Sequence, residues 1–154
     1  MPFRISGLPA ETFAPLFALS DTELASQGGV RQVAQGTEPC RISLTDAAPG
    51  DELLLVNFEH HPVASPYRGR YAVFVRPGEQ RFDSIGSIPD QLRRRTLAAR
   101  AFDACGMSIA VELVEGQALE QAIERQLGHA RTAYIHLHYA AAGCYAARVG
   151  RVSS

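Results

Sequence analysis

The sequence predicts an α+β fold in which a mostly antiparallel sheet is flanked by two or three helices. The first observation is the order of the elements: a strand, a helix, several strands, a helix, a strand, a helix and a final hairpin. The second is the length of 154 residues with 46% hydrophobic content, which is enough for a core. The third is the lack of a linker rich in Ser, Gly or Pro, so we expect residues 1–154 to form a single domain.

The first third of the chain combines short strands with one brief helix. Residues 3–5 are expected to form a strand that is closed by a Ser-Gly-Leu-Pro segment. Ser20 and Glu23 have the spacing of a capping box, which predicts a helix start. Residues 40–44 alternate between apolar and polar types, which predicts a half-buried strand with Cys40 on its core side.

Longer runs in the rest of the chain predict the main sheet and two helices. Strands are typical of runs rich in β-branched and aromatic residues, and amphipathic helices of apolar residues that recur every three or four positions. Leu119, Ile123 and Leu127 recur every four residues, and Gly128 follows them. The predicted strands cover residues 30–33, 53–58, 71–76, 107–114, 132–139 and 144–149, and the predicted helices cover residues 91–105 and 117–127.

The charge composition excludes several classes of function. The net charge of −1 does not favour nucleic-acid binding, because phosphate neutralisation requires a basic face. All 15 positive side chains are arginine, so lysine Schiff bases and P-loop lysines are excluded. Arginine binds carboxylate or phosphate through two parallel hydrogen bonds, which suits a small anionic ligand.

The sequence also predicts a compartment. The N-terminal residues lack a basic segment followed by a long apolar run, and no stretch approaches the ~20 apolar residues of a membrane span. Three cysteines without a secretory signal favour free thiols in a reducing environment. We therefore expect a cytoplasmic protein with no membrane partner.

The first candidate site is a pair of histidines on one predicted strand. Strand side chains alternate, so His136 and His138 point to the same face as Tyr134, while Ile135 and Leu137 point to the core. Two imidazoles side by side can chelate zinc, copper, iron or nickel. A bare H-x-H pair can equally form hydrogen bonds to neighbouring groups on a half-exposed sheet face, so both interpretations stay open.

A third ligand depends on the register of the final hairpin. With a three-residue loop, Arg148 lies opposite His136, and Cys144 shares the polar face with the histidines. With a four-residue loop, Cys144 faces Tyr139 and joins the apolar side. Both loop lengths are common, and a slip of one residue reverses the assignment, so the sequence leaves the register open. In the first register, Cys144 is a candidate metal ligand.

Arginines and histidines on neighbouring strands form a second candidate site. Arg68 and Arg70 lie near the start of one predicted strand, and His60 and His61 lie at the end of the strand before it. If these strands are paired, the two arginines and at least one histidine meet near one sheet edge and suit a carboxylate or phosphate ligand. The alternative is an exposed loop with solvated arginines.

Two functions follow from these candidates. In the first, the His136/His138 face binds a transition metal such as zinc or an anionic small molecule, and a metal with an open position would activate water for hydrolysis. In the second, the chain is a non-catalytic interaction or dimerisation module with the final hairpin and the arginines at the partner surface, because edge strands and exposed apolar residues favour pairing with another chain or a second copy. The sequence contains no G-x-S-x-G, P-loop, H-E-x-x-H or C-x-x-C motif, so it names no reaction and no catalytic residue.

A set of short segments along the chain carries a family resemblance. The segments are FRISGLP at 3–9, PCRISL at 39–44, SPYR at 65–68, IHLH at 135–138 and GCY at 143–145. Together they resemble a bacterial domain-of-unknown-function family, DUF1203, over the full length of the chain. The resemblance implies one domain and no assigned activity, and it transfers no catalytic residue.

Overall fold

The structure is a computed structural model that describes residues 2–152. The strands are β1 (Phe3–Ser6), β2 (Gly29–Val33), β3 (Glu52–His61), β4 (Gly69–Val75), β5 (Asp83–Ile85), β6 (Thr96–Phe102), β7 (Ser108–Glu115), β8 (Tyr134–Tyr139) and β9 (Tyr145–Arg151). The α-helices are α1 (Ala10–Phe13), α2 (Asp21–Ser26), α3 (Asp90–Arg93) and α4 (Leu119–Leu127), and the 3-10 helices are η1 (Ala14–Ala18) and η2 (Gly116–Ala118). No helix within residues 2–152 combines the length and the apolar character needed to cross a membrane.

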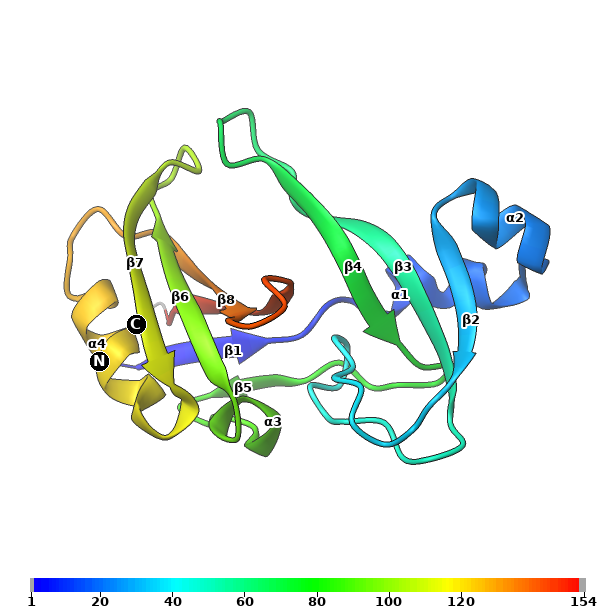
Figure 1. Cartoon of the computed structure of the whole chain (residues 1–154). Helices are drawn as coiled ribbons and strands as arrows, with labels where there is room; N and C mark the ends of the chain where they lie inside the picture. The colour runs from blue at the N-terminus through cyan, green and yellow to red at the C-terminus, as the bar shows by residue number, and fades with distance from the viewer. Residues whose placement is uncertain (1, 153–154) are drawn as a thin grey trace.

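The strands form two antiparallel sheets. The larger sheet has the strand order β5-β1-β9-β8-β6-β7, and the smaller sheet has the order β2-β3-β4. Every pair of neighbouring strands in these sheets is antiparallel. Figure 1 shows the sheets inclined to each other, with α4 outside the larger sheet and α1 and α2 beside the smaller one. The fold is therefore α+β with mostly antiparallel sheets, as the sequence predicts.

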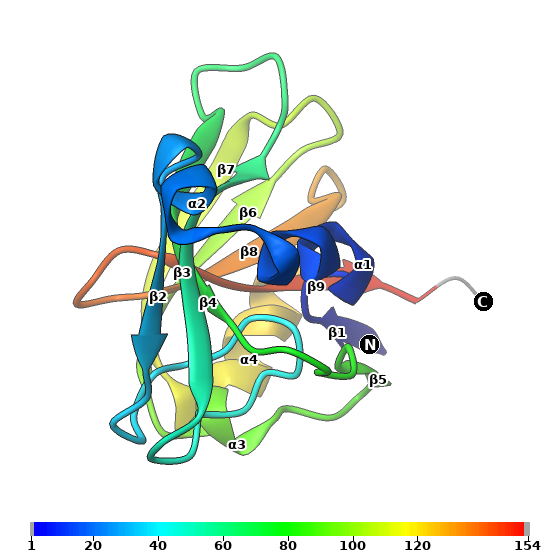
Figure 2. The same cartoon turned by 90° about the vertical axis from the view of Figure 1, so that its right-hand side faces the viewer.

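One face of the larger sheet packs against α4 and forms the main core. Leu119, Ile123 and Leu127 of α4 are buried together with sheet residues such as Leu97 and Leu137. The four-residue spacing that predicts this helix therefore corresponds to its buried face. The other face of the larger sheet is turned toward the smaller sheet, which stands in front of it in Figure 2.

The smaller sheet forms a second apolar cluster with the N-terminal helices. Leu54 and Val56 of β3 and Val73 of β4 pack with Phe13 of α1 and Leu24 of α2. These helices are short and gain little stability from their own hydrogen bonds, so they depend on this packing. The N-terminal part of the chain is thereby attached to the smaller sheet, although β1 belongs to the larger one.

Helix α2 begins with the predicted capping box. The Ser20 hydroxyl accepts a hydrogen bond from the Glu23 backbone N–H at 3.1 Å, and the Glu23 carboxylate accepts one from the Ser20 N–H at 2.9 Å. Two backbone groups at the helix start are thus satisfied reciprocally. These bonds also lower the pKa of Glu23, because they favour its ionised form.

The predicted helix over residues 91–105 is wrong beyond its first turn. Helix α3 ends at Arg93, and strand β6 follows. Leu97, Ala99 and Ala101 are fully buried and alternate with less buried residues, which is the period of a strand. Alanine and leucine favour helices when isolated, but β6 pairs with β7 on one side and β8 on the other. Pairing on both sides overrides the local preference.

The predicted strand over residues 40–44 is also wrong. The segment forms a turn in which Leu44 has a φ of 55°. Its apolar–polar alternation has a different origin, because Cys40, Ile42 and Leu44 are each buried in a different apolar cluster. The prediction that Cys40 is a core residue is confirmed by its exposure of 0%.

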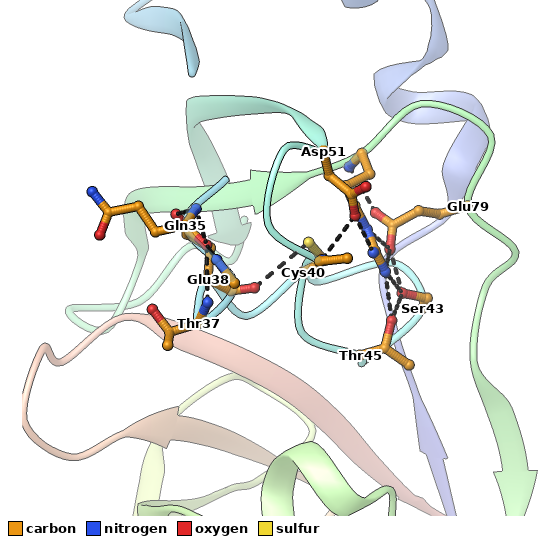
Figure 3. A network of polar contacts seen from close by, with 11 residues as sticks. Gln35, Thr37, Glu38, Cys40, Ser43, Thr45, Asp51 and Glu79 are labelled. Carbon is orange, nitrogen blue, oxygen red and sulfur yellow. Dashed lines mark hydrogen bonds and ion pairs between the residues drawn. The ribbon is translucent and has the colours of Figure 1, made fainter. Parts of the chain in front are cut away.

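Polar contacts hold this irregular segment in place (Figure 3). Arg76 donates hydrogen bonds to Thr45 at 2.6 Å, to Asp51 at 2.9 Å and to Glu79 at 3.3 Å. On the other side of the segment, the Glu38 carboxylate accepts from three backbone N–H groups, those of Gln35, Gly36 and Thr37. These bonds give the loop a fixed shape without regular secondary structure.

Gly7 marks the place where the chain leaves the larger sheet. It follows the last residue of β1, and Leu8 after it packs in the apolar cluster of the smaller sheet. A Cβ atom on Gly7 would lie 2.1 Å from the backbone oxygen of Ile42 and 2.8 Å from that of Arg41. The crossing between the sheets therefore has room for glycine only.

We expect Gly7→Ala to lower the free energy of unfolding by about 3 kcal/mol, because the added methyl group overlaps backbone atoms that cannot rotate away. Gly150→Ala is the matched control, since the nearest atom to its added Cβ is the flexible end of Arg148 at 3.2 Å. The control should change stability by less than about 1 kcal/mol. Urea denaturation followed by circular dichroism measures both variants, and equal losses would contradict this account of the crossing.

Candidate functional site

Strand β8 carries its two histidines on the face that is turned toward the smaller sheet. His136 is 5% exposed and His138 is 6% exposed. Ile135 and Leu137 belong to the main core on the other face. The predicted alternation along β8 is therefore confirmed, but the histidine face is buried rather than half-exposed.

His60 and His61 at the end of β3 cover the β8 histidines from the smaller sheet. Consecutive strand residues normally point in opposite directions, but the register of β3 against β4 shifts between Phe58 and His61. A bulge of this kind re-aims side chains. Both histidines consequently reach β8, with ring centroids 4.9 Å apart for His61 and His136 and 5.3 Å apart for His60 and His138. We refer to His60, His61, His136 and His138 as the histidine cluster.

Backbone carbonyls fix the orientation of two rings in the cluster. A carbonyl only accepts, so Nδ1 of His61 donates to the Tyr67 oxygen at 2.8 Å, and Nδ1 of His138 donates to the Gly143 oxygen at 3.0 Å. In the neutral ring of His61, Nε2 then accepts from the Tyr134 hydroxyl at 2.6 Å. In the neutral ring of His138, Nε2 is the unprotonated nitrogen.

Three polar atoms of this region are buried without a hydrogen-bond partner among the described residues. They are Nδ1 of His60, Nδ1 of His136 and Nε of Arg100. A buried polar atom without a partner costs about 1–3 kcal/mol. Their convergence on one face marks it as a place where a bound group would gain hydrogen bonds.

Burial keeps three of the histidines uncharged at neutral pH. It lowers the pKa of His136 from 6.5 to about 2, and the neighbouring His61 and His138 act in the same direction. Burial is also the main cause that lowers the pKa values of His60 and His138 to about 4. These rings therefore supply hydrogen-bond donors and acceptors, and they contribute no positive charge.

The final hairpin combines the two registers that the sequence leaves open. Near the turn, the Tyr139 N–H donates to the Cys144 carbonyl at 2.9 Å, as the four-residue loop requires. Farther along, Ala146 has no partner on β8, and this bulge shifts the register by one residue. Beyond the bulge Arg148 pairs with His136, as the three-residue loop requires.

The bulge separates Cys144 from the histidines. Cys144 packs in the main core and contacts Arg41, with 3.0 Å between Sγ and Nη2. The structure therefore does not bring Cys144 together with His136 and His138, and the metal-ligand prediction for this cysteine loses its geometric basis. The predicted neighbourhood of Arg148 and His136 is present.

Two arginines flank His136 in one row across the larger sheet. Arg100 on β6 pairs with His136 from one side, and Arg148 on β9 pairs with it from the other. The Arg148 guanidinium lies over the Tyr134 ring, 5.1 Å from its centroid. Neither arginine forms an ion pair with a carboxylate within residues 2–152. This part of the face therefore carries positive charge that no side chain of the described range neutralises.

The arginines predicted near the start of β4 are bound elsewhere. Arg68 forms an ion pair with Glu59 at 3.1 Å, and the Arg70 guanidinium donates to the side-chain oxygen of Asn57. Arg68 lines a cavity beside the histidine cluster, but its charge is paired. Arg70 lines neither of the two cavities at the cluster. Of this predicted site, His60 and His61 are the members that lie within the cluster.

Two cavities adjoin the histidine cluster, and His60, His61 and His136 line both. The cavity on the Arg148 side has a volume of about 380 Å³, and the cavity on the Arg100 side has a volume of about 300 Å³. The first also contains Tyr134, Tyr145, Ser6 and Arg81, and the second also contains His138, Phe102 and two tyrosines. Pockets of this size and mixed lining suit small molecules.

The side chains on this face that could ligate a metal are the imidazoles of His60, His136 and His138. Rings that share a metal at roughly 2.1 Å have centroids about 5 Å apart, and the centroid of His60 lies 5.3 Å from that of His138 and 6.4 Å from that of His136. However, no group of three or more His, Cys, Asp or Glu side chains among residues 2–152 is arranged to hold a metal ion.

Sequence reasoning missed Arg100 as a member of this face. The prediction of a helix over residues 91–105 gave Arg100 no place on a sheet, whereas β6 places it beside His136. The alternation of Leu97, Ala99 and Ala101 is the signal that could have identified the strand.

Comparison with known proteins identifies a family and no function. A family model described as "Protein of unknown function (DUF1203)" matches residues 37–151. No curated protein and no solved structure matches the chain. The resemblance carried by the IHLH and GCY segments lies within the matched range, whereas the FRISGLP segment lies before it.

The lowered pKa values make stability depend on pH. When the folded-state pKa of a histidine lies below its unfolded value of about 6.5, the unfolded chain binds more protons than the folded chain as the pH falls. The contribution of His136 to stability is therefore complete above pH 6.5 and is lost progressively toward pH 2, by up to about 1.4 kcal/mol per pH unit. We expect the free energy of unfolding of the wild type to decrease from pH 7 to pH 5.

His136→Phe should make this decrease less steep, since it removes one of the buried rings that must take up a proton on unfolding. His129→Gln is the matched control, because His129 is exposed and lies outside the cluster. Urea denaturation at pH 7, 6 and 5 measures the slope, in a range above most carboxylate titrations. If all three proteins had the same slope, burial of His136 as a neutral ring would be disproved.

Proposed function

The chain belongs to the DUF1203 family, a family of unknown function, and for this member we propose that the histidine face of β8 binds a small anionic molecule. The single observation that carries the proposal is the row of Arg100, His136 and Arg148 across three neighbouring strands. Two guanidinium groups without carboxylate partners in the described range border a buried imidazole that has an unpartnered nitrogen.

Charge supports an anion as the ligand. A buried or half-buried positive charge is favourable only when it is paired or hydrogen-bonded. Arg100 is half-buried and its Nε has no partner, so an anion beside it would satisfy both its charge and its free N–H. Glu59 is a carboxylate in the lining of the larger cavity, and Arg68 already pairs with it.

The neutral histidines support selectivity for an anion with its own hydrogen-bonding groups. A neutral imidazole offers one N–H donor and one acceptor nitrogen. His60 and His136 each have a buried Nδ1 without a partner among the described residues, and both line the two cavities. A phosphate or carboxylate would accept from the arginines and a ring N–H, whereas a simple halide would satisfy fewer of these groups.

A transition metal such as zinc is the second candidate ligand, and one observation favours it. Nδ1 of His138 donates to a backbone carbonyl, which leaves Nε2 unprotonated, and histidines that bind metals commonly have this arrangement. His60, His136 and His138 are neutral at pH 7, as metal ligands must be. Metal binding would require the rings to move, because no suitable group is preformed within residues 2–152.

A dimerisation module stays the alternative from a different class. Strand β7 is at the edge of the larger sheet, and Val111 and Leu113 on it are 61% and 73% exposed. Exposed edge strands favour pairing with another chain. A homodimer through such an edge therefore stays a prediction. The cytoplasmic location, which the sequence predicts on other grounds, also stays a prediction.

We expect the wild type to bind inorganic phosphate, used as the probe anion, and Arg148→Gln to weaken this binding at least tenfold. A hydrogen bond to a charged group contributes about 1.5–3 kcal/mol, which corresponds to roughly 10- to 150-fold in affinity. Arg148 is exposed, so the substitution should leave the fold intact. Isothermal titration calorimetry at low ionic strength measures the dissociation constants.

Arg70→Gln is the matched control, because Arg70 is an exposed arginine outside both cavities. Its phosphate affinity should stay within twofold of the wild type. Equal effects of the two substitutions would indicate a nonspecific charge effect, and no heat of binding for the wild type up to about 10 mM phosphate would reject the anion site.

The metal candidate makes a separate prediction. If zinc is the ligand, dialysis followed by elemental analysis should find about one equivalent in the wild type and a loss of most of it in His138→Gln, since Nε2 of this ring is the prepared ligand atom. Arg148→Gln should retain the zinc. Retention of zinc by His138→Gln, or its absence from the wild type, would reject the metal.

A further inference from the structure

A second group of reactive side chains lies on the other side of the β8–β9 hairpin from the histidine cluster. The Cys144 sulfur is 3.0 Å from Nη2 of Arg41, a residue of the irregular segment between β2 and β3. The guanidinium of Arg41 also lies over the Tyr139 ring, 4.9 Å from its centroid. This group shares no lining residue with the two cavities at the histidine cluster.

Arg41 is a buried positive charge without a carboxylate partner in the described range. It is 1% exposed, and its guanidinium donates to the backbone carbonyls of Tyr145 and Pro39 in addition to the sulfur of Cys144. Burial of an unpaired guanidinium is costly, so a counter-charge is expected close to it. Of the three groups that accept hydrogen bonds from the Arg41 guanidinium, the thiol is the one that can become an anion.

A cavity of about 510 Å³ opens at this sulfur. It is lined by Cys144 and Arg41, by Tyr139 and Phe74, and by Arg95 and Ala142. The Arg95 guanidinium lies over the Tyr139 ring as well, 5.4 Å from its centroid. A small molecule in this cavity would therefore meet a sulfur atom between aromatic and cationic groups. Cys144 is 9% exposed and borders the cavity, so a small molecule in the cavity would meet its sulfur in the electropositive surroundings typical of reactive cysteines.

We propose that Cys144 is a nucleophilic thiolate paired with Arg41, and that it is a site of covalent modification by small electrophiles of the hydroperoxide class. The sulfur attacks one oxygen of the hydroperoxide, an S–O bond forms and the O–O bond breaks. Sulfur is oxidised by two electrons to a sulfenic acid, and the peroxide is reduced to a hydroxide or alkoxide, which takes a proton from water. The proposal does not depend on a ligand at the histidine cluster.

The other two cysteines supply internal references. Cys105 is exposed, whereas Cys40 is 0% exposed and Cys144 is 9% exposed. Burial raises the pKa of Cys40 to about 12, so its thiol should be inert at neutral pH. Accessibility alone would rank the reactivity as Cys105, then Cys144, then Cys40. Activation by Arg41 would instead place Cys144 first.

Alkylation of the native wild-type protein with iodoacetamide at pH 7 tests this order. An S–C bond forms while the C–I bond breaks, and iodide leaves, so the probe reports the nucleophilicity of each sulfur. Peptide mass spectrometry over time should give a rate for Cys144 at least five times that of Cys105, with Cys40 unreacted. A rate for Cys144 at or below that of Cys105 would overturn the proposal without any variant.

Two variants separate the ion pair from the general surroundings. Arg41→Gln should slow the alkylation of Cys144 at least tenfold relative to Cys105 in the same molecule, and circular dichroism checks that the variant is folded. Arg95→Gln is the matched control, because Arg95 lines the same cavity but forms no hydrogen bond with the sulfur. Its rate should stay within twofold of the wild type, and equal slowing by both substitutions would reject the specific pair.

Hydrogen peroxide then tests the chemical class. After treatment of the wild type, the sulfenic acid should be trapped by dimedone on Cys144 before Cys105. Trapping on Cys105 first, or no trapping on Cys144, would overturn the assignment to hydroperoxides. The alkylation rates separately test whether the Cys144 sulfur is a strong nucleophile.

Discussion

The arrangement of reactive side chains depends on one extra residue in strand β9. Because Ala146 has no partner on β8, the side chains before and after it follow different registers. In a regular strand, Cys144, Ala146 and Arg148 would share one face. The bulge instead leaves Cys144 in the main core beside Arg41 and brings Arg148 next to His136. The unpaired Ala146 thus places the Cys144 thiol on the core side of the larger sheet, and the imidazoles of His136 and His138 lie on its other face.

Local patterns in the sequence predict the elements, and the departures from them arise from tertiary pairing. The alternation of residues 134–139 and the capping box at Ser20 are properties of a few neighbouring residues, so they can be read directly. The bulge at Ala146 is different, because a hairpin of either loop length satisfies the local chemistry and only the packing of both faces selects the mixture. The helix propensity of the alanines in β6 led to the prediction of a helix there, so the position of Arg100 on a strand could not be predicted.

Charge on the histidine face comes from arginine and not from histidine. Burial under the smaller sheet makes protonation of His60, His136 and His138 unfavourable, and their proximity adds mutual repulsion. Arg100 and Arg148 supply guanidinium groups to this face, and neither has a carboxylate partner in the described range. The face therefore combines guanidinium groups with three imidazole rings, His60, His136 and His138, that stay uncharged at the pH at which a free histidine titrates.

The histidine cluster is divided between the two sheets, since His60 and His61 come from β3 and His136 and His138 come from β8. A molecule bound among them would contact both sheets at once. Because the two pairs of histidines come together only in the folded chain, such a molecule would bind the folded state and not the unfolded one. Its binding free energy would add to that of folding, by about 2.7 kcal/mol at a concentration one hundred times the dissociation constant. Proteases remove chains through their unfolded state, so the lifetime of this protein in the cell would follow the supply of its ligand.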